Sequence, residues 1–211
     1  MGVIPMFGGG RGMRATSWMA VLMAAVLWAG CQRLKPVDTH ALDMAGMGYD
    51  TVSQLKGLKV TQAEVAQVAE ARQAGLSDAA CLQVMQIYRS RKQEFDAGDS
   101  IAGLLGAGGS EELVLKLARI NQLGLGAGEL EAMRLAGLSD DVLLAVAQHH
   151  AAGQPVLSGA SLASMKNLGM GSSTLLQLAE RGVPDSQAPQ IMALRRRGVR
   201  DSEILRQFAG S

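Results

Sequence analysis

Residues 72–78 read Arg-Gln-Ala-Gly-Leu-Ser-Asp, and residues 134–140 repeat this phrase as Arg-Leu-Ala-Gly-Leu-Ser-Asp. Shorter versions of it stand at 180–185 and 196–201. In each copy a glycine can take the left-handed conformation that ends a helix, and the apolar residue after it can pack against the last turn. Serine then caps the next helix, and the following aspartate suits the positive end of the helix dipole. The phrase therefore predicts a helix, a three-residue turn and a second helix. The glycines expected to be left-handed are Gly75, Gly137, Gly182 and Gly198.

The sequence between these turns has the periodicity of short helices. Thr61 and Glu64 form a capping-box pattern that begins a helix, and apolar residues recur three or four positions apart. A second glycine phrase, Leu-Gly-hydrophobic-Gly, occurs at 123–126 and again at 168–171. No run of alternating β-branched residues predicts a strand. We expect an all-α fold over residues 53–211, with short helices joined by Gly-hydrophobic-Ser/Asp turns into a helical-hairpin bundle or a short array.

The composition excludes several functional classes. Of the 211 residues, 48% are hydrophobic and only 3% are aromatic; the formal net charge is +1, and there are 2 cysteines and 3 histidines. Two cysteines cannot build a disulfide framework, and a net charge near zero gives no general attraction to nucleic acid. Few aromatic rings are present to stack on sugars, bases or flat cofactors. We therefore expect no cofactor, no metal ion and no small-molecule substrate.

Charge is distributed unevenly along the chain. Residues 32–93 have eight basic and six acidic side chains, residues 94–159 have three and nine, and residues 160–211 have seven and four. The last segment includes the basic run 195–197 and Arg200. Segments of opposite charge can pack together within one molecule or between copies, and the plainer alternative is a set of solvated helix faces.

The start of the chain has the pattern of a targeting signal. Residues 15–32 contain no charged side chain and follow two arginines, which is the layout of a secretory signal peptide. The small residues Ala29 and Gly30 stand directly before Cys31, and this ending resembles the lipobox of bacterial lipoproteins. The resemblance implies that residues 1–30 are removed and that acyl chains such as palmitate are attached to Cys31. An uncleaved membrane anchor and an ordinary secretory signal cut near Ala29 are the alternatives.

The same resemblance implies a location for the mature protein. Gln32 follows the cysteine, and in proteobacterial lipoproteins the absence of aspartate at that position implies anchoring in the outer membrane, here facing the periplasm. Residues 31–52 include proline and glycine and lack strong periodicity. We interpret them as the lipid attachment and a flexible tether that holds the helical-hairpin domain off the bilayer.

The glycine turn at 168–171 resembles the helix-hairpin-helix motif of nucleic-acid-binding proteins. In that family, backbone N–H groups of the turn hold a DNA phosphate without reading sequence. The resemblance implies that Gly169 and Gly171 are phosphate contacts, with Lys166 and Arg181 as supporting cations. The structural alternative is a glycine turn between packed helices.

Signatures of catalysis are absent from the sequence, which has no Gly-x-Ser-x-Gly, Gly-x-x-x-x-Gly-Lys or Cys-x-x-Cys motif. His149 and His150 are adjacent, whereas a zinc-binding helix needs histidines four residues apart. Cys81 stands among apolar residues, which predicts a buried side chain rather than a reactive thiol. We therefore expect a non-catalytic, lipid-anchored envelope protein that acts as a helical scaffold or protein-interaction module. Its expected partner is another envelope protein or a second copy. A periplasmic, non-sequence-specific DNA binder is the alternative.

Overall fold

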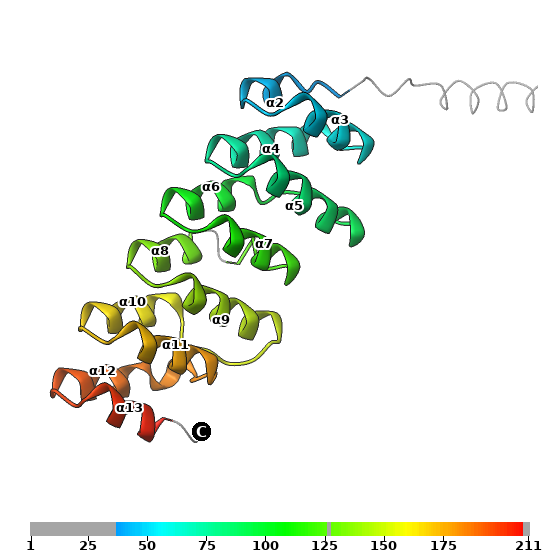
Figure 1. Cartoon of the computed structure of the whole chain (residues 1–211). Coiled ribbons are helices and arrows are strands. Elements are labelled where there is room, and N and C mark those ends of the chain that lie inside the picture. Colours follow the sequence, from blue (N-terminus) through cyan, green and yellow to red (C-terminus); the bar gives the residue numbers. More distant parts are fainter. Residues whose placement is uncertain (1–36, 126–127, 209–211) are drawn as a thin grey trace, which may run out of the picture. The chain divides into compact units, whose positions relative to one another are not determined.

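The computed structural model describes residues 37–125 and 128–208, which form six successive helical hairpins and, within these ranges, no strand (Figure 1). The expected all-α fold is confirmed. The helices are α2 (His40–Met44), α3 (Tyr49–Gly57), α4 (Gln62–Gln73), α5 (Asp78–Ser90), α6 (Gly98–Gly106), α7 (Glu111–Arg119), α8 (Glu129–Leu135), α9 (Asp140–Ala151), α10 (Gly159–Asn167), α11 (Ser172–Glu180), α12 (Ala188–Arg196) and α13 (Asp201–Gln207). A 3-10 turn, η1 (Asp185–Gln187), precedes α12. Each of the helices in the described ranges is too short or too polar to cross a bilayer.

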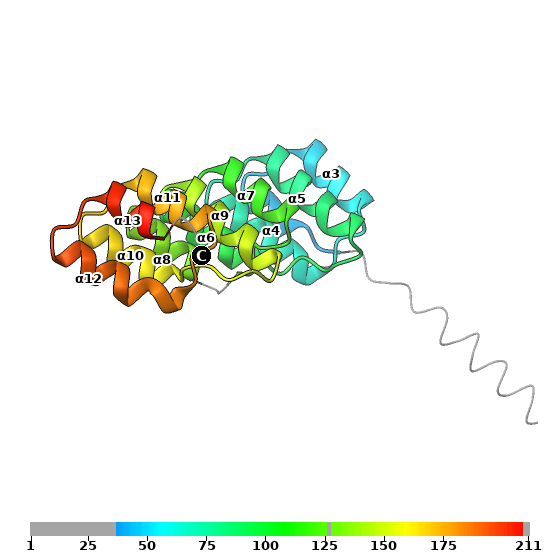
Figure 2. The same ribbon diagram turned by 90° about the horizontal axis from the view of Figure 1, so that it is seen from below.

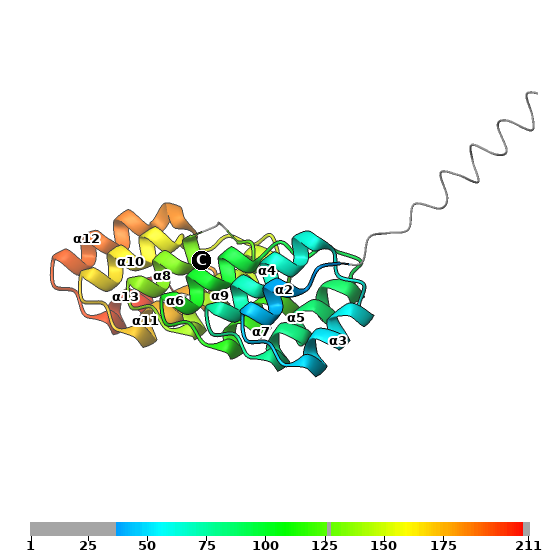
Figure 3. The ribbon, with the colours of Figure 1, turned by 90° about the horizontal axis from the view of Figure 1, so that it is seen from above.

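The hairpins stack into two layers of helices. In the first layer α2, α4, α6, α8, α10 and α12 pack side by side, and in the second layer α3, α5, α7, α9, α11 and α13 do so. Figure 2 and Figure 3 show the two rows from opposite sides. The order of packing follows the chain, and the first and last hairpins lie at opposite ends (Figure 1). The hairpins therefore form an open array rather than a closed bundle.

The second residue after the end of every helix from α2 to α12 has positive φ. Eight of these eleven residues are glycines, and among them Gly75, Gly137, Gly182 and Gly198 have φ of 109°, 78°, 64° and 80°, the conformation expected from the turn phrase. Three helix ends lack glycine and use Lys59, Lys92 and Asn121, with φ of 56°, 56° and 58°.

The hairpins alternate between two kinds. We call the first, third and fifth hairpins odd and the second, fourth and sixth even. The left-handed glycines inside successive hairpins are Gly46, Gly75, Gly108, Gly137, Gly169 and Gly198, and their spacing alternates between 29 and 32 or 33 residues. The arginine of the turn phrase occurs only in even hairpins, as Arg72, Arg134 and Arg195, at spacings of 62 and 61 residues. The repeating unit is therefore a pair of hairpins, present three times.

The expected flexible tether over 31–52 is wrong for its second half. Helix α2 begins at His40, and Leu42 and Val52 are buried, with exposed fractions of 0% and 4%. The short sequence between α2 and α3, Ala-Gly-Met-Gly, is a copy of the turn phrase that lacks serine and aspartate. Because α2 has only five residues, it is too short to show a helical period in the sequence. The proposed signal peptide and Cys31 lie outside the described residues.

The two Leu-Gly-hydrophobic-Gly phrases are not equivalent positions of a repeat. Residues 168–171 form the turn inside the fifth hairpin, between α10 and α11. Residues 123–125 lie instead in the connection from α7 to α8, which joins two hairpins. Gly169 is the left-handed residue after α10, whereas the left-handed residue after α7 is Asn121 and Gly124 has no positive φ.

Helix α13 has polar residues where earlier helices of its layer are buried. Five residues after the turn glycine, the first five hairpins place buried or half-buried side chains, whereas the last places exposed Glu203. Nine residues after that glycine, the last hairpin places exposed Gln207. A polar outer face is typical of a helix that ends a stack of repeats. The buried equivalents of Gln207 are Leu55, Val84, Leu117, Val146 and Leu178.

Candidate functional site

The turn between α10 and α11 is the phosphate site that the sequence suggests, and its backbone groups have partners within the chain. Gly169 N–H donates to the carbonyl oxygen of Lys166 over 2.9 Å, at the end of α10. Gly171 N–H donates to Oδ2 of Asp201 over 2.8 Å. The carboxylate of Asp201 therefore occupies the position of an anion bound at the N-terminus of α11.

Asp201 and Arg195 together hold this turn from the following hairpin. Nη1 of Arg195 lies 3.0 Å from Oδ1 of Asp201, and Nη2 of Arg195 donates to the carbonyl oxygen of Gly169 over 2.6 Å. Thr174 Oγ1 donates to Oδ2 of Asp201 over 3.1 Å. The arginine thus binds a turn carbonyl while the aspartate binds a turn amide.

The same arrangement recurs at the other two even hairpins. Gly48 N–H donates to Asp78 over 2.7 Å, and Ser110 N–H donates to Asp140 over 3.2 Å. The matching arginines donate to the turn carbonyl of the preceding hairpin, over 3.4 Å for Arg72 to Gly46 and 2.9 Å for Arg134 to Gly108. Three odd-to-even junctions are therefore linked in one way. We call these links the turn clamps, made by the pairs Arg72–Asp78, Arg134–Asp140 and Arg195–Asp201.

Of the two supporting cations, the structure places only Lys166 at the glycine turn. Lys166 Nζ donates to Ser172 Oγ over 2.7 Å, at the start of α11. Arg181 follows the other end of this nine-residue helix, about 13 Å away along the axis, and donates to the carbonyl oxygen of Leu205 over 3.1 Å. The four residues named for phosphate binding therefore do not converge.

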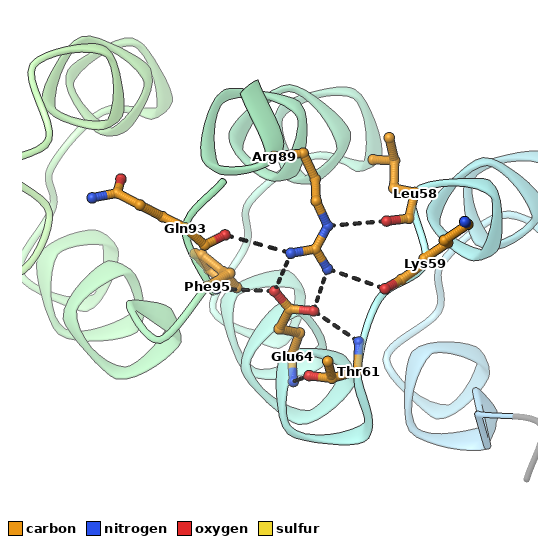
Figure 4. Close-up of polar contacts among 7 residues, drawn as sticks. All are labelled: Leu58, Lys59, Thr61, Glu64, Arg89, Gln93 and Phe95. Carbon is orange, nitrogen blue, oxygen red and sulfur yellow. Dashed lines mark hydrogen bonds and ion pairs between the residues drawn. The ribbon is translucent and has the colours of Figure 1, made fainter. Parts of the chain in front are cut away.

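A buried carboxylate in the second hairpin holds the connections on both sides of that hairpin, through a network that the sequence indicates only in part (Figure 4). Glu64 has a side-chain exposure of 0%. The capping box is present, because Thr61 N–H donates to Oε2 of Glu64 and Glu64 N–H donates to Thr61 Oγ1, over 2.7 and 3.2 Å. Oε1 also accepts from Arg89 Nη1 over 2.8 Å and from Phe95 N–H over 3.0 Å. Nη2 of Arg89 bonds to Oε2 as well.

Arg89 also binds the connections on both sides of its own hairpin. Its Nε and Nη2 donate to the carbonyl oxygens of Leu58 and Lys59 over 2.9 and 3.3 Å, and Nη1 donates to that of Gln93 over 3.4 Å. Burial raises the pKa of the Glu64 carboxyl, but the hydrogen bonds from Arg89, Thr61 and Phe95 outweigh burial and hold the pKa below its usual range. All acceptor sites of the carboxylate are used by the protein, so this network is structural.

The other chemistry-bearing residues are placed as packing groups. Cys81 is 2% exposed, and burial raises the pKa of its thiol to about 12. Nε2 of His149 lies 3.1 Å from the carbonyl oxygen of Glu180 in the next hairpin of the array. Among residues 37–125 and 128–208, no three or more of the histidine, cysteine, aspartate and glutamate side chains gather as metal ligands.

The chain matches no family model, no curated protein and no solved structure. Its function is therefore inferred from the array and its surfaces.

One surface repeats along five of the six hairpins. Seven residues after the turn glycine, the second to sixth hairpins all have a leucine that packs on the core and is partly exposed. The first hairpin has the exposed Ser53 at this position. Each leucine lies on a different helix of the second layer. We call this set the leucine row, and it consists of Leu82, Leu115, Leu144, Leu176 and Leu205.

Proposed function

We propose that this protein is a non-catalytic, lipid-anchored envelope protein that acts as a helical scaffold, and that a partner protein binds along the leucine row. The leucine row is the observation that supports the proposal. Neighbouring helices in a layer lie about 8–10 Å apart, so five leucines at one position extend along most of the array. Repeat arrays present such extended surfaces to binding partners.

Ser53 indicates that the fold does not need leucine at this position. The first hairpin packs on the second through α2 with α4 and α3 with α5, although its equivalent side chain is a hydroxyl. A partly exposed leucine gains only part of the free energy of burial, because the rest of its apolar area stays hydrated. A partner that covers the leucine row would bury the remaining apolar area of all five leucines, and this supports a docking surface along the row.

The anchor in this proposal is Cys31, through the lipobox resemblance. Several acyl chains on one cysteine give stable membrane attachment, whereas a single chain gives only marginal binding. Residues 32–36 and the start of the array at Val37 would then set the distance between the bilayer and the first hairpin.

Site-specific photo-crosslinking in bacteria that process lipoproteins tests the partner surface. A photo-reactive amino acid replaces Gln148, exposed on α9 near the row, or Gln73, exposed on α4 in the other layer. We expect a discrete adduct from position 148 and none from position 73. The substitutions Leu115→Ser, Leu144→Ser and Leu176→Ser, made together, should remove the adduct while the circular dichroism spectrum stays helical. Adduct formation that survives the triple substitution, or no adduct at position 148, would overturn the leucine row as a docking surface.

The anchor has a separate test. The intact mass of protein extracted from membranes should fit residues 31–211 plus acyl groups, and Cys31→Ala should abolish both cleavage and acylation. An unprocessed, unacylated wild-type mass would remove the lipoprotein part of the proposal and leave the scaffold part to the crosslinking.

DNA-phosphate binding has weaker support, because the carboxylate of Asp201 already accepts from Gly171 N–H. Its test is retention of the protein on DNA at low salt. Retention lost on Gly169→Asp with Lys166→Glu would favour DNA binding, and no retention by the wild type would exclude it.

A further inference from the structure

A hollow of about 260 Å³ lies on the other side of the array, where α6 and α8 meet the connection between α7 and α8. We call it the acidic hollow. Its apolar lining comes from three leucines, of which Leu125 is partly exposed and the other two are buried, and its polar lining includes two carboxylates. An apolar recess with charged groups at its edge fits an occupant that carries both an aliphatic side chain and a charge. The lining residues are Asp99, Ser100, Leu123, Leu125, Gly128, Leu130 and Glu131.

The carboxylates at this hollow lack a cation from the same molecule. None of the ion pairs formed within residues 37–125 and 128–208 includes Asp99, Glu131 or the neighbouring Glu70. A hydrogen bond with Asp99, burial and the negative charge of Asp99 together raise the pKa of Glu70. Two carboxyl groups from α4 and α6 thus share this edge without a positive partner, and a cation from outside would relieve their repulsion.

The opposite combination stands at the turn between α12 and α13. Arg196, Arg197 and Arg200 are exposed, and none of them takes part in an ion pair within the described ranges. Apolar side chains accompany them. Leu194 and Val199 are half-buried, whereas their equivalents in the fourth hairpin, Met133 and Leu138, are 0% and 1% exposed. This turn therefore carries exposed cations beside partly exposed aliphatic groups.

The turn and the hollow cannot meet within one molecule. In the first layer, α10 lies between α8, which lines the hollow, and α12. Each step between neighbouring helices is about 8–10 Å, so the distance exceeds the reach of an arginine side chain. Complementary groups that cannot meet within one chain can meet between two chains.

We propose that the α12–α13 turn of one copy docks in the acidic hollow of a second copy. Arg196, Arg197 and Arg200 face the carboxylates Asp99 and Glu131, and the aliphatic groups beside the arginines cover Leu125, the partly exposed leucine of the hollow. The contact joins two different surfaces, so a pair of copies keeps one free hollow and one free turn, and association can continue into open chains of copies. This inference uses the first layer and does not depend on the leucine row.

The test is a charge exchange in the full-length chain in detergent, followed by sedimentation velocity over a range of concentrations. We expect the wild type to associate at low salt and to dissociate at 0.5 M salt, because screening weakens the contact. Asp99→Lys with Glu131→Lys, or Arg196→Glu with Arg197→Glu, should each weaken association by at least about tenfold, since like charges then face each other. An equimolar mixture of the two variants should associate again, because each reversed surface meets a reversed partner.

A matched variant controls for the change in net charge. Lys56→Glu with Arg119→Glu alters two exposed cations away from both surfaces and should associate as the wild type does. Wild-type protein that stays monomeric at every concentration would overturn the proposal. Association that both reversed variants retain would overturn it as well. A monomer that binds a leucine- and arginine-containing peptide through Asp99 and Glu131 would assign the hollow to another protein.

Discussion

A left-handed residue stands two positions after the end of every helix from α2 to α12, and its identity differs between helix ends. Glycine accepts this conformation freely, and asparagine tolerates it better than other residues with a Cβ. Lysine gains nothing from it. Lys59 and Lys92 nevertheless take φ of 56°. The glycine phrase could therefore be recognised in the sequence at four helix ends, whereas the lysine ends carried no local signal.

Lys59→Gly should stabilise the protein. The left-handed conformation costs a residue with a Cβ about 1–2 kcal/mol, and part of this gain is lost to the greater freedom of glycine in the unfolded chain. We expect a net increase of about 0.5–1 kcal/mol in the free energy of unfolding, measured by urea denaturation. Lys56→Gly, in the last turn of α3, is the control and should destabilise by up to about 1 kcal/mol. Equal effects of the two substitutions would contradict this account of Lys59.

Gly137→Val should act in the opposite direction. Gly137 has φ of 78°, and a β-branched residue is strained there although no atom lies within 4 Å of the added Cβ. We expect a loss of about 2 kcal/mol in urea denaturation. Gly106→Ala is the comparison, because Gly106 lies in α6 with equally open space and without positive φ. Gly106→Ala should be neutral or stabilising, and a Gly137→Val variant as stable as wild type would refute the left-handed cap.

Glu64 makes stability depend on pH. Its folded-state pKa is lowered, so its contribution is present above the unfolded pKa of about 4.3 and is lost as pH falls through the folded pKa. Glu64→Gln should cost about 2–3 kcal/mol at pH 7, because Arg89 loses its buried partner. Between pH 5 and pH 3, the wild type should lose more stability than this variant, as followed by urea denaturation at each pH. Glu94→Gln, at an exposed site, should keep the wild-type pH profile. Parallel profiles of wild type and Glu64→Gln would show that Glu64 does not titrate in this range.

At the scale of helices and hairpins, the turn clamps show what the sequence could and could not predict. The phrase contains the arginine, the glycine and the aspartate, and it correctly predicts helix, turn and helix. Its aspartate has an adequate local explanation in the helix dipole. Asp201 instead reaches back about 30 residues to bind Gly171 N–H, a contact that only stacking creates. The sequence therefore indicated that this turn can bind an anion. It did not indicate that the anion in the fold is the carboxylate of Asp201.

The turn clamps should differ in the coupling free energy between their arginine and their aspartate. Arg72 Nε lies 2.7 Å from Asp78 Oδ1, whereas Arg134 Nη1 lies 3.7 Å from Asp140 Oδ1. We expect a coupling free energy of about 1 kcal/mol from a double-mutant cycle of Arg72→Met and Asp78→Asn. The cycle of Arg134→Met and Asp140→Asn should give about 0.3 kcal/mol.

Arg134→Met alone should nevertheless cost about 1–2 kcal/mol. Arg134 donates to the carbonyl oxygens of Gly108 and Leu138, both over 2.9 Å, and these bonds do not involve Asp140. A larger coupling at Arg134–Asp140 than at Arg72–Asp78 would show that the ion-pair distances do not govern the clamps.

At the scale of the whole array, the last hairpin differs from the hairpins in the middle. Glu203 and Gln207 face outward from the last hairpin at positions that are apolar in most of the others, so the stack ends there without an exposed core. The α12–α13 turn keeps its arginines and two half-buried aliphatic side chains at one edge of this end. The last hairpin is therefore closed to a seventh hairpin yet open, at its edge, to the contact proposed with a second copy.

Apolar residues on the outward face of α13 should allow the array to associate through its last hairpin. Glu203→Leu with Gln207→Leu restores the residue types of earlier hairpins, and we expect concentration-dependent association that persists at 0.5 M salt, because burial of apolar area drives it. Light scattering after size-exclusion chromatography measures the mass. Gln86→Leu, on the side of α5, is the control and should leave the mass unchanged. Unchanged mass of the double variant would mean that the polar face of α13 is not what ends the stack.

The alternation of odd and even hairpins also bears on inheritance. Removing one hairpin would place two odd or two even hairpins in contact, and an odd hairpin has no arginine with which to hold the turn before it: Asp43, Leu105 and Lys166 stand at the positions of Arg72, Arg134 and Arg195. Removing a pair, such as α6 to α9, joins an even hairpin to an odd one as before. We therefore expect the gene to have lengthened by duplication of segments that encode two hairpins. Proteins related to this one should then differ in length by whole pairs of hairpins.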